Sequence, residues 1–262
     1  MKMKCRFIDT GFNDAFTNMA IDEALLNSEI PVLRVYFWKP GAISVGYNQN
    51  IKEINSEYCK KNNIEIVRRL TGGKAVFHDQ EITYSFIVPE NSNLLPYEIN
   101  ESYKTIANAL VITLKKININ AEIKKTPERI ETPVCFNSSN WYELLVDNKK
   151  ISGSAQRRMN GKILQHGSLL IDFDYNKNNS LFNTTNSFDN LKQRITSIKN
   201  ETNKIINANK IKEAIKQGFK ENFSFEMIND SLTDEEIKLT EKLNQEKYST
   251  EEWNFNLIAK TI

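Results

Sequence analysis

Apolar and polar residues alternate with different periods along the first two-thirds of the chain, and these periods predict both strands and helices. Apolar runs rich in β-branched and aromatic residues are typical of buried strands, and they lie at residues 32–38, 64–67, 83–88 and 163–171. Residues 99–117 instead carry an apolar stripe at helical spacing, the clearest helix signal in the sequence. We therefore expect an α+β fold with a mixed, largely antiparallel sheet flanked by helices.

Shorter segments fill the gaps between these elements. Helices are expected at 18–26 and 54–62, and further strands at 42–46, 142–146 and 150–151. The turn signal Lys39-Pro40-Gly41 lies between two strand segments, so we expect residues 32–38 and 42–46 to pair as a hairpin.

The C-terminal third has a different composition. Asn, Lys, Ser and Thr dominate residues 176–207, which predicts a loose connection. Two helix signals follow: an apolar face from Ile211 to Phe219, and a capping box formed by Thr233 and Glu236. We expect three parts: a core at 1–175 that holds the chemistry, a connector at 176–208, and a small helical C-terminal extension of the same domain at 209–262.

Composition excludes several classes of protein. The 262 residues are 40% hydrophobic and contain only 9 Gly and 6 Pro, which excludes a disordered chain and a collagen-like repeat. The net charge of +2 does not favour nucleic acid as a partner. We expect no membrane span, because no run of 18 apolar residues occurs, and no signal peptide, because residues 1–9 lack an apolar stretch.

The three cysteines, Cys5, Cys59 and Cys135, are far apart in the sequence, and there are only two histidines. This spacing does not provide the clustered ligands of a structural zinc site, so no metal is expected. Reduced thiols in a cytoplasmic protein are the simplest interpretation.

Residues 68–79, which read Arg-Arg-Leu-Thr-Gly-Gly-Lys-Ala-Val-Phe-His-Asp, concentrate candidate binding groups. Gly72 and Gly73 allow backbone N–H groups to approach a ligand oxygen closely, and the basic neighbours favour an acyl carbonyl or a phosphate. The segment is not a Walker loop, because Arg68 and Ala75 stand where that motif needs a glycine and a hydroxyl residue. Taken alone, a Gly-Gly pair is more typical of a hairpin turn.

Two further segments carry candidate reactive groups. Cys135, in Pro-Val-Cys-Phe-Asn, is a possible nucleophile if a cation or nearby amides stabilise its thiolate, although most single cysteines are small buried hydrophobic residues. Lys150 opens Lys-Ile-Ser-Gly-Ser-Ala-Gln, and a lysine at a strand edge can polarise a carbonyl or help to deprotonate an amine. Taken alone, Lys150 fits a solvated hairpin tip, and His78 and His166 fit structural histidines.

Together, the three segments and His-Gly-Ser-Leu-Leu from residue 166 closely resemble, in order and spacing, the biotin/lipoate protein ligase superfamily. Within it, the sequence is most similar to the lipoate-forming octanoyltransferases of the Gram-positive type. The similarity starts at Arg6, includes Asn-Met-Ala-Ile-Asp-Glu-Ala from residue 18, and runs to about Asp174. It implies a mixed sheet flanked by helices, with the acyl chain in a tunnel roofed by the Gly-Gly loop.

The resemblance also implies roles for particular residues. Cys135 corresponds to the acyl-accepting cysteine and Lys150 to the lysine of the Lys-x-Ser-Gly motif, so these two are the expected catalytic residues. The expected substrate-binding residues are Arg69, Thr71, Gly72, Gly73, Lys74, Ala75, His78, Ser152, Gly153, Ala155, His166 and Gly167.

Two branches of the superfamily differ in their acyl donor. ATP-dependent lipoate ligases typically carry a third glycine where Lys74 stands and Gly-Asn where Glu81-Ile82 stand. These departures and Cys135 favour a transferase that takes octanoyl from octanoyl-acyl carrier protein and passes it to a lysine of a lipoyl-carrier protein, such as the glycine cleavage H protein. Since a thioester is already activated, no cofactor is expected; the chain is expected to act as a monomer, with no nucleic acid or membrane as partner.

A mechanism follows as a hypothesis. The Cys135 thiolate attacks the thioester carbonyl, while Lys150 and the amides near Gly72 and Gly73 stabilise the oxyanion. The acceptor lysine then attacks the acyl-Cys135 thioester, and Lys150 or His78 takes its proton. An ATP-dependent lipoate ligase, an amidotransferase between lipoyl domains and a non-catalytic acyl-binding module remain alternatives.

Overall fold

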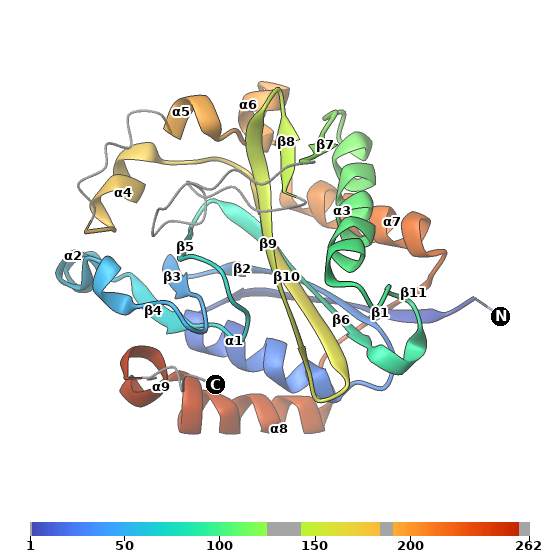
Figure 1. The fold of residues 1–262 in the computed structure, drawn as a ribbon, viewed down its shortest axis with the longest axis horizontal. Helices are drawn as coiled ribbons and strands as arrows, with labels where there is room; N and C mark the ends of the chain where they lie inside the picture. The colour runs from blue at the N-terminus through green and yellow to red at the C-terminus, as the bar shows by residue number, and fades with distance from the viewer. Residues whose placement is uncertain (1, 125–142, 184–190, 257–262) are drawn as a thin grey trace.

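The computed structural model describes residues 2–124, 143–183 and 191–256, and its centre is an eight-stranded sheet (Figure 1). In spatial order the strands are β11 (Glu226–Asp230), β1 (Lys4–Asn13), β2 (Val32–Trp38), β6 (Glu81–Pro89), β10 (Lys162–Leu170), β9 (Lys149–Met159), β8 (Leu144–Val146) and β7 (Glu122–Ile123). Strand β1 runs parallel to β11 and β2, and the remaining pairs are antiparallel. The expected α+β class with a mixed, largely antiparallel sheet is confirmed.

A second sheet of three strands lies beside the first. Its central strand β3 (Ala42–Val45) runs parallel to β4 (Glu65–Arg68) and antiparallel to β5 (Val76–His78). The predicted hairpin of residues 32–38 and 42–46 is therefore wrong, because β2 and β3 belong to different sheets. Both edges of β2 are occupied, by β1 and β6, so the turn at Lys39-Pro40-Gly41 carries the chain from one sheet to the other.

The helices cover the two sheets from both sides. They are α1 (Ala15–Ala24), α2 (Ser56–Lys61), α3 (Ile99–Lys116), α4 (Tyr175–Ser180), α5 (Leu191–Arg194), α6 (Ile198–Thr202), α7 (Ala208–Phe223), α8 (Asp234–Leu243) and α9 (Glu251–Phe255). Short helical turns occur at η1 (Leu25–Asn27), η2 (Ile51–Glu53), η3 (Glu90–Ser92) and η6 (Asn244–Tyr248). Asp14 caps α1, and the predicted capping box of Thr233 and Glu236 starts α8. None of the helices in the described ranges is long and apolar enough to cross a lipid bilayer.

The two faces of the main sheet differ in chemistry. On the apolar face, Phe86 of β6 packs with Leu110 of α3 and Phe219 of α7 in the largest hydrophobic cluster. Figure 1 shows α3 and α7 side by side over this face. The opposite face, which we call the polar face, carries Arg34, Ser85 and His166 in register on β2, β6 and β10. All three of these side chains are buried, so they need partners inside the protein.

The C-terminal segment packs against the core at several points. Strand β11, which the sequence pattern did not predict, pairs with β1 at the edge of the sheet. Helix α8 lies along α1 (Figure 1). The Arg6 guanidinium contacts both carboxylate oxygens of Glu236 at 2.5 and 2.8 Å. In the part of residues 176–208 that the structure describes, α5 and α6 lie within the range and α4 begins just before it, at Tyr175. The division at 175 and 208 stays a prediction.

Candidate active site

A cavity lies between the polar face of the main sheet and the small sheet. Residues from α1, from β2, β6, β9 and β10 of the main sheet, and from β3, β5 and the loop between β4 and β5 line it: Met19, Tyr36, Trp38, Ser44, Arg69, Gly73, Val76, His78, Thr83, Gly153, Ser154, Ala155, His166, Gly167 and Ser168. Methionine, valine and aromatic side chains stand beside a few convergent polar groups, which is the usual make-up of a small-molecule site.

The structure brings most of the predicted binding residues to this cavity. Seven of them line it directly: Arg69, Gly73, His78, Gly153, Ala155, His166 and Gly167. Thr71, Gly72, Lys74 and Ala75 belong to the same loop as Gly73, and Ser152 is adjacent to Gly153 on β9; these five are not among the described residues that line the cavity. Cys135 lies outside the described residues, so its assignment stays a prediction.

The Gly-Gly loop, residues 71–74, follows β4 and packs tightly against the residues after β3. Tyr47 N–H donates to the Thr71 carbonyl at 2.8 Å. A Cβ on Gly46 would stand 2.0 Å from the Gly73 carbonyl oxygen, so only glycine fits there, and Gly73 itself has φ +91°. The tight packing of the loop therefore depends on Gly46 as well as on the Gly72-Gly73 pair, and the sequence pattern did not identify Gly46.

Arg69 shapes the same loop from inside. Its guanidinium donates to the carbonyl oxygens of Gly72 at 2.7 Å, Lys74 at 2.8 Å and Ser44 at 2.8 Å. A planar guanidinium offers five donors in fixed directions, and here three carbonyls of two segments receive them. Arg69 was expected to bind substrate, but these contacts give it a role in holding the loop.

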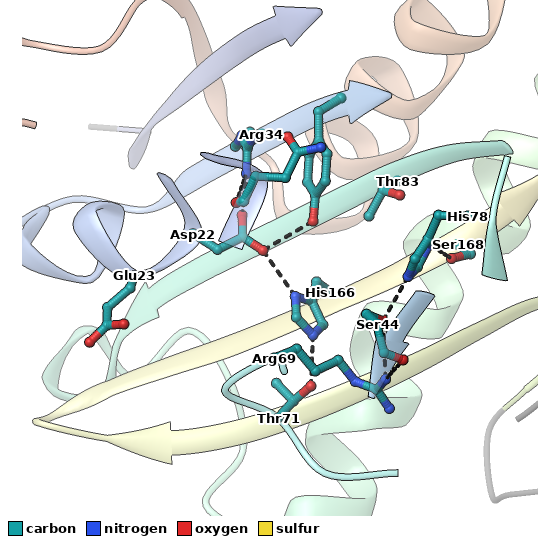
Figure 2. Close-up of polar contacts among 12 residues, drawn as sticks. Asp22, Glu23, Arg34, Ser44, Arg69, Thr71, His78, Thr83, His166 and Ser168 are labelled. Atoms are coloured by element: carbon teal, nitrogen blue, oxygen red, sulfur yellow. Dashed lines mark hydrogen bonds and ion pairs between the residues drawn. The ribbon is translucent and has the colours of Figure 1, made fainter. Parts of the chain in front are cut away.

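His166 stands between a carboxylate and the loop. Its Nδ1 lies 2.9 Å from Asp22 Oδ2 and its Nε2 lies 2.7 Å from Thr71 Oγ1 (Figure 2). Burial lowers the pKa of His166 and outweighs the opposing effect of its hydrogen bond to Asp22, so the imidazole is neutral at pH 7. Burial alone would raise the pKa of Asp22, but the charge of Arg34 and the His166 hydrogen bond lower it, so Asp22 is ionised.

His78 has the same kind of surroundings. Its Nδ1 lies 2.8 Å from Glu81 Oε1. Its Nε2 lies 2.7 Å from Ser44 Oγ (Figure 2). The Glu81 oxygen also accepts from the hydroxyls of Thr83 and Ser168, both at 2.7 Å. The ring of His78 stacks on Trp38, with centroids 4.0 Å apart, which fixes its orientation in the cavity wall.

Lys150, the second residue of β9, is buried and forms an ion pair with Glu143, 2.5 Å from Nζ to Oε1. Leu145 is paired with Lys150, and the preceding Leu144 is paired with Ser152, so Ile151 is an extra residue on β9. Because neighbouring strand residues point to opposite faces, this bulge puts Lys150 on the face opposite Ser152, which is the face of Gly153. Lys150 therefore belongs to the polar face, although it is not among the described residues that line the cavity.

Sequence reasoning missed several polar groups of the site. These groups, which were not assigned a role, are Asp22, Arg34, Ser44, Glu81, Glu143 and Ser168. Ser44 and Ser168 line the cavity, and Asp22 and Glu81 contact its two histidines. Arg34 contacts Asp22, and Glu143 contacts Lys150. Their common signal is a charged or hydroxyl residue within an otherwise apolar segment, such as Arg34 in Val-Leu-Arg-Val-Tyr-Phe-Trp. Polar residues are stable in a buried strand only with partners, so such positions point to a network.

Comparison with known proteins agrees with this arrangement. A family model described as the lipoyl protein ligase A/B catalytic domain matches residues 14–220. The octanoyltransferase LipM of Bacillus subtilis is 38% identical over 270 residues, covering 95% of this chain and 97% of that protein. The octanoyltransferase LipM of Staphylococcus aureus is 39% identical over 269 residues, with the same coverage.

Solved structures share the fold. A T. acidophilum protein solved with bound lipoic acid matches with a TM-score of 0.80 and 26% identity, covering 98% of this chain and 100% of that chain. A lipoate-protein ligase A bound with ATP matches with a TM-score of 0.81 and 25% identity, covering 98% of this chain and 100% of that chain.

Proposed function

Since this chain belongs to the lipoyl protein ligase A/B catalytic domain family, we propose that it is an acyltransferase that moves an octanoyl group onto a lysine of a lipoyl-carrier protein in lipoate biosynthesis. The proposed donor is octanoyl-acyl carrier protein, and the proposed intermediate is a thioester on Cys135. Octanoyl transfer is the activity in the names of the curated relatives, which match almost the whole chain. The donor and the intermediate are the part that experiment must test.

The observation that carries this proposal is the cavity beside the Gly-Gly loop. Its walls include Met19, Trp38 and Val76, which suit an unbranched acyl chain. At about 0.8 kcal/mol for each buried CH₂, an eight-carbon chain gains several kcal/mol there, while a charged substrate group gains nothing from these walls. Polar groups converge at Arg69, His78 and His166, where the reactive carbonyl end would lie.

In the proposed first step, the Cys135 thiolate attacks the donor thioester carbonyl. The carrier leaves as a thiolate and takes a proton from the Lys150 ammonium, so Lys150 becomes neutral. The oxyanion that forms needs hydrogen-bond donors, and the backbone amides of Gly72 and Gly73 with the Lys150 ammonium are the proposed ones. The change from one thioester to another is nearly neutral in free energy, so this step needs no nucleotide.

In the second step, the amine of the acceptor lysine attacks the Cys135 thioester and forms an amide, which is downhill. The amine must lose a proton, and a neutral Lys150 is the proposed acceptor; the thiolate of Cys135 leaves. The Glu143 carboxylate, 2.5 Å from Lys150, is placed to balance its charge when the proton arrives. We further propose that the chain acts as a monomer in the cytoplasm, with a lipoyl-carrier protein such as the glycine cleavage H protein as acceptor.

The test is a donor panel against one apo lipoyl domain. The chain is incubated separately with octanoyl-acyl carrier protein, octanoylated H protein, and octanoate with ATP, and product is measured by intact mass. Transfer from the carrier protein, with a transient octanoyl adduct on the enzyme, is the expected result. AMP release from octanoate and ATP, with no transfer from the carrier protein, would establish a ligase instead.

Cys135→Ala and Cys135→Ser locate the adduct. We expect Cys135→Ala to abolish both adduct and transfer, and Cys135→Ser to form a slow oxygen ester. Cys59→Ala is the matched control, because Cys59 is a buried thiol on α2 in a separate apolar cluster. An adduct that survives in Cys135→Ala contradicts the assignment.

A further inference from the structure

Two buried chains of hydrogen bonds converge on the Gly-Gly loop, and they have the same chemical order. Each starts at a carboxylate, passes through a histidine and reaches a hydroxyl group. Figure 2 shows the first chain and the link from His78 to Ser44. We propose that Asp22 and Glu81 are positioning residues that act through these chains to hold the Gly-Gly loop over the cavity. The inference rests on the proposed function only for what the loop does to substrate.

The first chain runs from Asp22 through His166 to Thr71. An ionised carboxylate only accepts hydrogen bonds, so His166 Nδ1 must carry the proton that faces Asp22. The neutral ring then has a lone pair at Nε2, and the Thr71 hydroxyl donates to it at 2.7 Å. Arg34 fixes the start of the chain, because it contacts Asp22 Oδ1 at 2.6 Å.

The second chain runs from Glu81 through His78 and Ser44 to Arg69. Glu81 Oε1 already accepts from two hydroxyls, so we assign it as the acceptor from His78 Nδ1, with the Ser44 hydroxyl donating to Nε2. This leaves the Ser44 oxygen as an acceptor, and Arg69 Nη1 donates to it at 3.1 Å. Arg69 in turn holds the carbonyls of Gly72 and Lys74. The second chain therefore ends on the same loop as the first.

The two chains fix complementary parts of the loop. Thr71 is held by its side chain at the start of the loop, and Gly72 and Lys74 are held by their carbonyls farther along. With these carbonyls turned toward Arg69, the directions of the adjoining peptide N–H groups are fixed as well. Donors that stabilise an oxyanion work only when they are aimed before the charge develops.

Stability alone does not account for such chains. Asp22, His166, Glu81 and His78 are each at most 6% exposed, and buried charged or polar groups can often be replaced by apolar ones of similar volume without loss of stability. Apolar residues cannot, however, supply hydrogen bonds that hold the loop in one orientation. The ring nitrogens of both histidines are also occupied, so neither histidine is placed to take a proton from an incoming amine.

The test compares two Thr→Val variants, which make the same change of shape at different sites, with Thr71→Ser. Thr71→Val removes the hydroxyl that donates a hydrogen bond to His166, and Thr71→Ser keeps that hydroxyl. Thr240→Val is the control. Thr240 is a buried threonine on α8, and its hydroxyl has no hydrogen-bond partner among the described residues. Each variant is assayed for octanoyl transfer, and the loop is followed by hydrogen exchange of peptides that span residues 69–76.

We expect Thr71→Val to lower kcat by up to about 100-fold with a smaller change in KM, because the donors are misplaced rather than lost. Exchange of the loop peptide should rise several-fold while exchange of β6 stays as in the natural chain. Thr71→Ser should restore most of both values. If Thr71→Val retains natural kcat and loop protection, the proposal is wrong.

Double-mutant cycles test whether the carboxylates act through the hydroxyls. Asp22→Asn is combined with Thr71→Val, and Glu81→Gln with Ser44→Ala. Effects on kcat should be strongly non-additive within each pair, since either change breaks the same chain. Additive effects would show that the carboxylates do not act through these hydroxyls, which overturns the positioning role.

The loop measurement separates this inference from the proposed function. Hydrogen exchange reports the order of residues 69–76 whether or not octanoyl is the substrate. If no donor in the panel reacts with the natural chain, the proposed function fails; if Thr71→Val also leaves exchange unchanged, the positioning role fails independently.

Discussion

The two faces of the main sheet are both buried, but they are built in opposite ways. On the apolar face, aromatic rings of β6, α7 and the segment after α7 pack together. For example, the ring centroids of Phe86 and Phe219 are 5.1 Å apart. On the polar face, polar side chains contact one another: Arg34 donates to Asp22 at 2.6 Å, and the Nδ1 atoms of His78 and His166 lie 2.8 Å from Glu81 and 2.9 Å from Asp22. One face is held by contact area, which is non-directional, and the other by hydrogen bonds, which are directional.

This difference separates stability from activity. Packing losses on the apolar face should lower the free energy of unfolding and leave the cavity intact. Loss of a hydrogen bond on the polar face should lower the catalytic rate even where the packing of the side chains hardly changes. The four predictions below test that separation, from the largest expected effect to the smallest.

Lys150→Met should cause the largest change. It removes the proposed oxyanion donor, which should lower the transfer rate about 10²- to 10³-fold. It also leaves the buried Glu143 carboxylate without this partner, at a cost of about 3–5 kcal/mol in unfolding free energy. Single-turnover transfer and denaturant unfolding measure the two effects.

The double variant Lys150→Met/Glu143→Gln is the control for Lys150→Met. It should recover most of the unfolding free energy, because no unpaired charge remains, but none of the transfer rate. Recovery of transfer would show that Lys150 matters only through the ion pair.

Phe219→Ala tests the apolar face. The ring is fully buried between α7 and β6, so its loss should cost about 3–5 kcal/mol of unfolding free energy. The fraction that remains folded should keep kcat/KM within about twofold, because distant sites act independently. A fall in kcat/KM that matches the loss of stability would mean that the two faces are coupled.

Gly46→Ala and Gly218→Ala form a matched pair. At Gly46 a Cβ would meet the Gly73 carbonyl at 2.0 Å, so the Gly-Gly loop must move and transfer should fall by up to about 100-fold. At Gly218 a Cβ would meet Thr113 Oγ1 at 2.2 Å and Ala109 O at 2.5 Å, so α3 and α7 must separate, at a cost of about 1–3 kcal/mol. Rates and denaturation midpoints of both variants check this; equal effects on both quantities would contradict it.

Acid should weaken the polar face more than the apolar face. Burial raises the pKa of Glu236, but its hydrogen bond from Arg6 is among the contacts that lower it below the ordinary value, and the pKa of Asp22 is also lowered. A carboxyl group with a depressed pKa in the folded state stabilises the protein at neutral pH. This stabilisation is lost as pH falls below about 4, where the unfolded chain binds the proton first.

Denaturant midpoints at pH 7, 5 and 3.5 measure this loss. The midpoint should change little between pH 7 and 5 and fall between pH 5 and 3.5. Arg6→Met should show a smaller fall, because it removes the cation that depresses the pKa of Glu236. An equal fall in the natural chain and in Arg6→Met would assign the acid sensitivity to other groups.

Local patterns predicted much of the fold. The stripe at 99–117 gave α3, the apolar runs gave β2, β4, β6 and β10, and the capping box gave the start of α8. These succeeded because burial on one side imposes a period that is visible in the sequence. The hairpin of β2 and β3 failed, because a turn signal fixes a change of direction and not the partner of each strand.

The site shows the same limit. The motif around Gly72 and Gly73 predicted the loop and, through resemblance, the family, which the comparisons confirm. It did not predict Asp22 or Glu143, because Asp22 acts on His166, which is 144 positions away in the sequence. The sequence also did not predict the bulge at Ile151, which decides whether Lys150 lies on the polar or the apolar face of the sheet.

The sequence by itself determined the spacing of apolar residues and the motifs that contain glycine, histidine and lysine. This was enough to predict the class of fold and the family. Only the tertiary structure decided which carboxylate faces which imidazole, and which hydroxyl donates to the second ring nitrogen. The reason is physical: periodicity records how one segment buries its own side chains, whereas a hydrogen bond depends on the direction between two segments that only folding brings together.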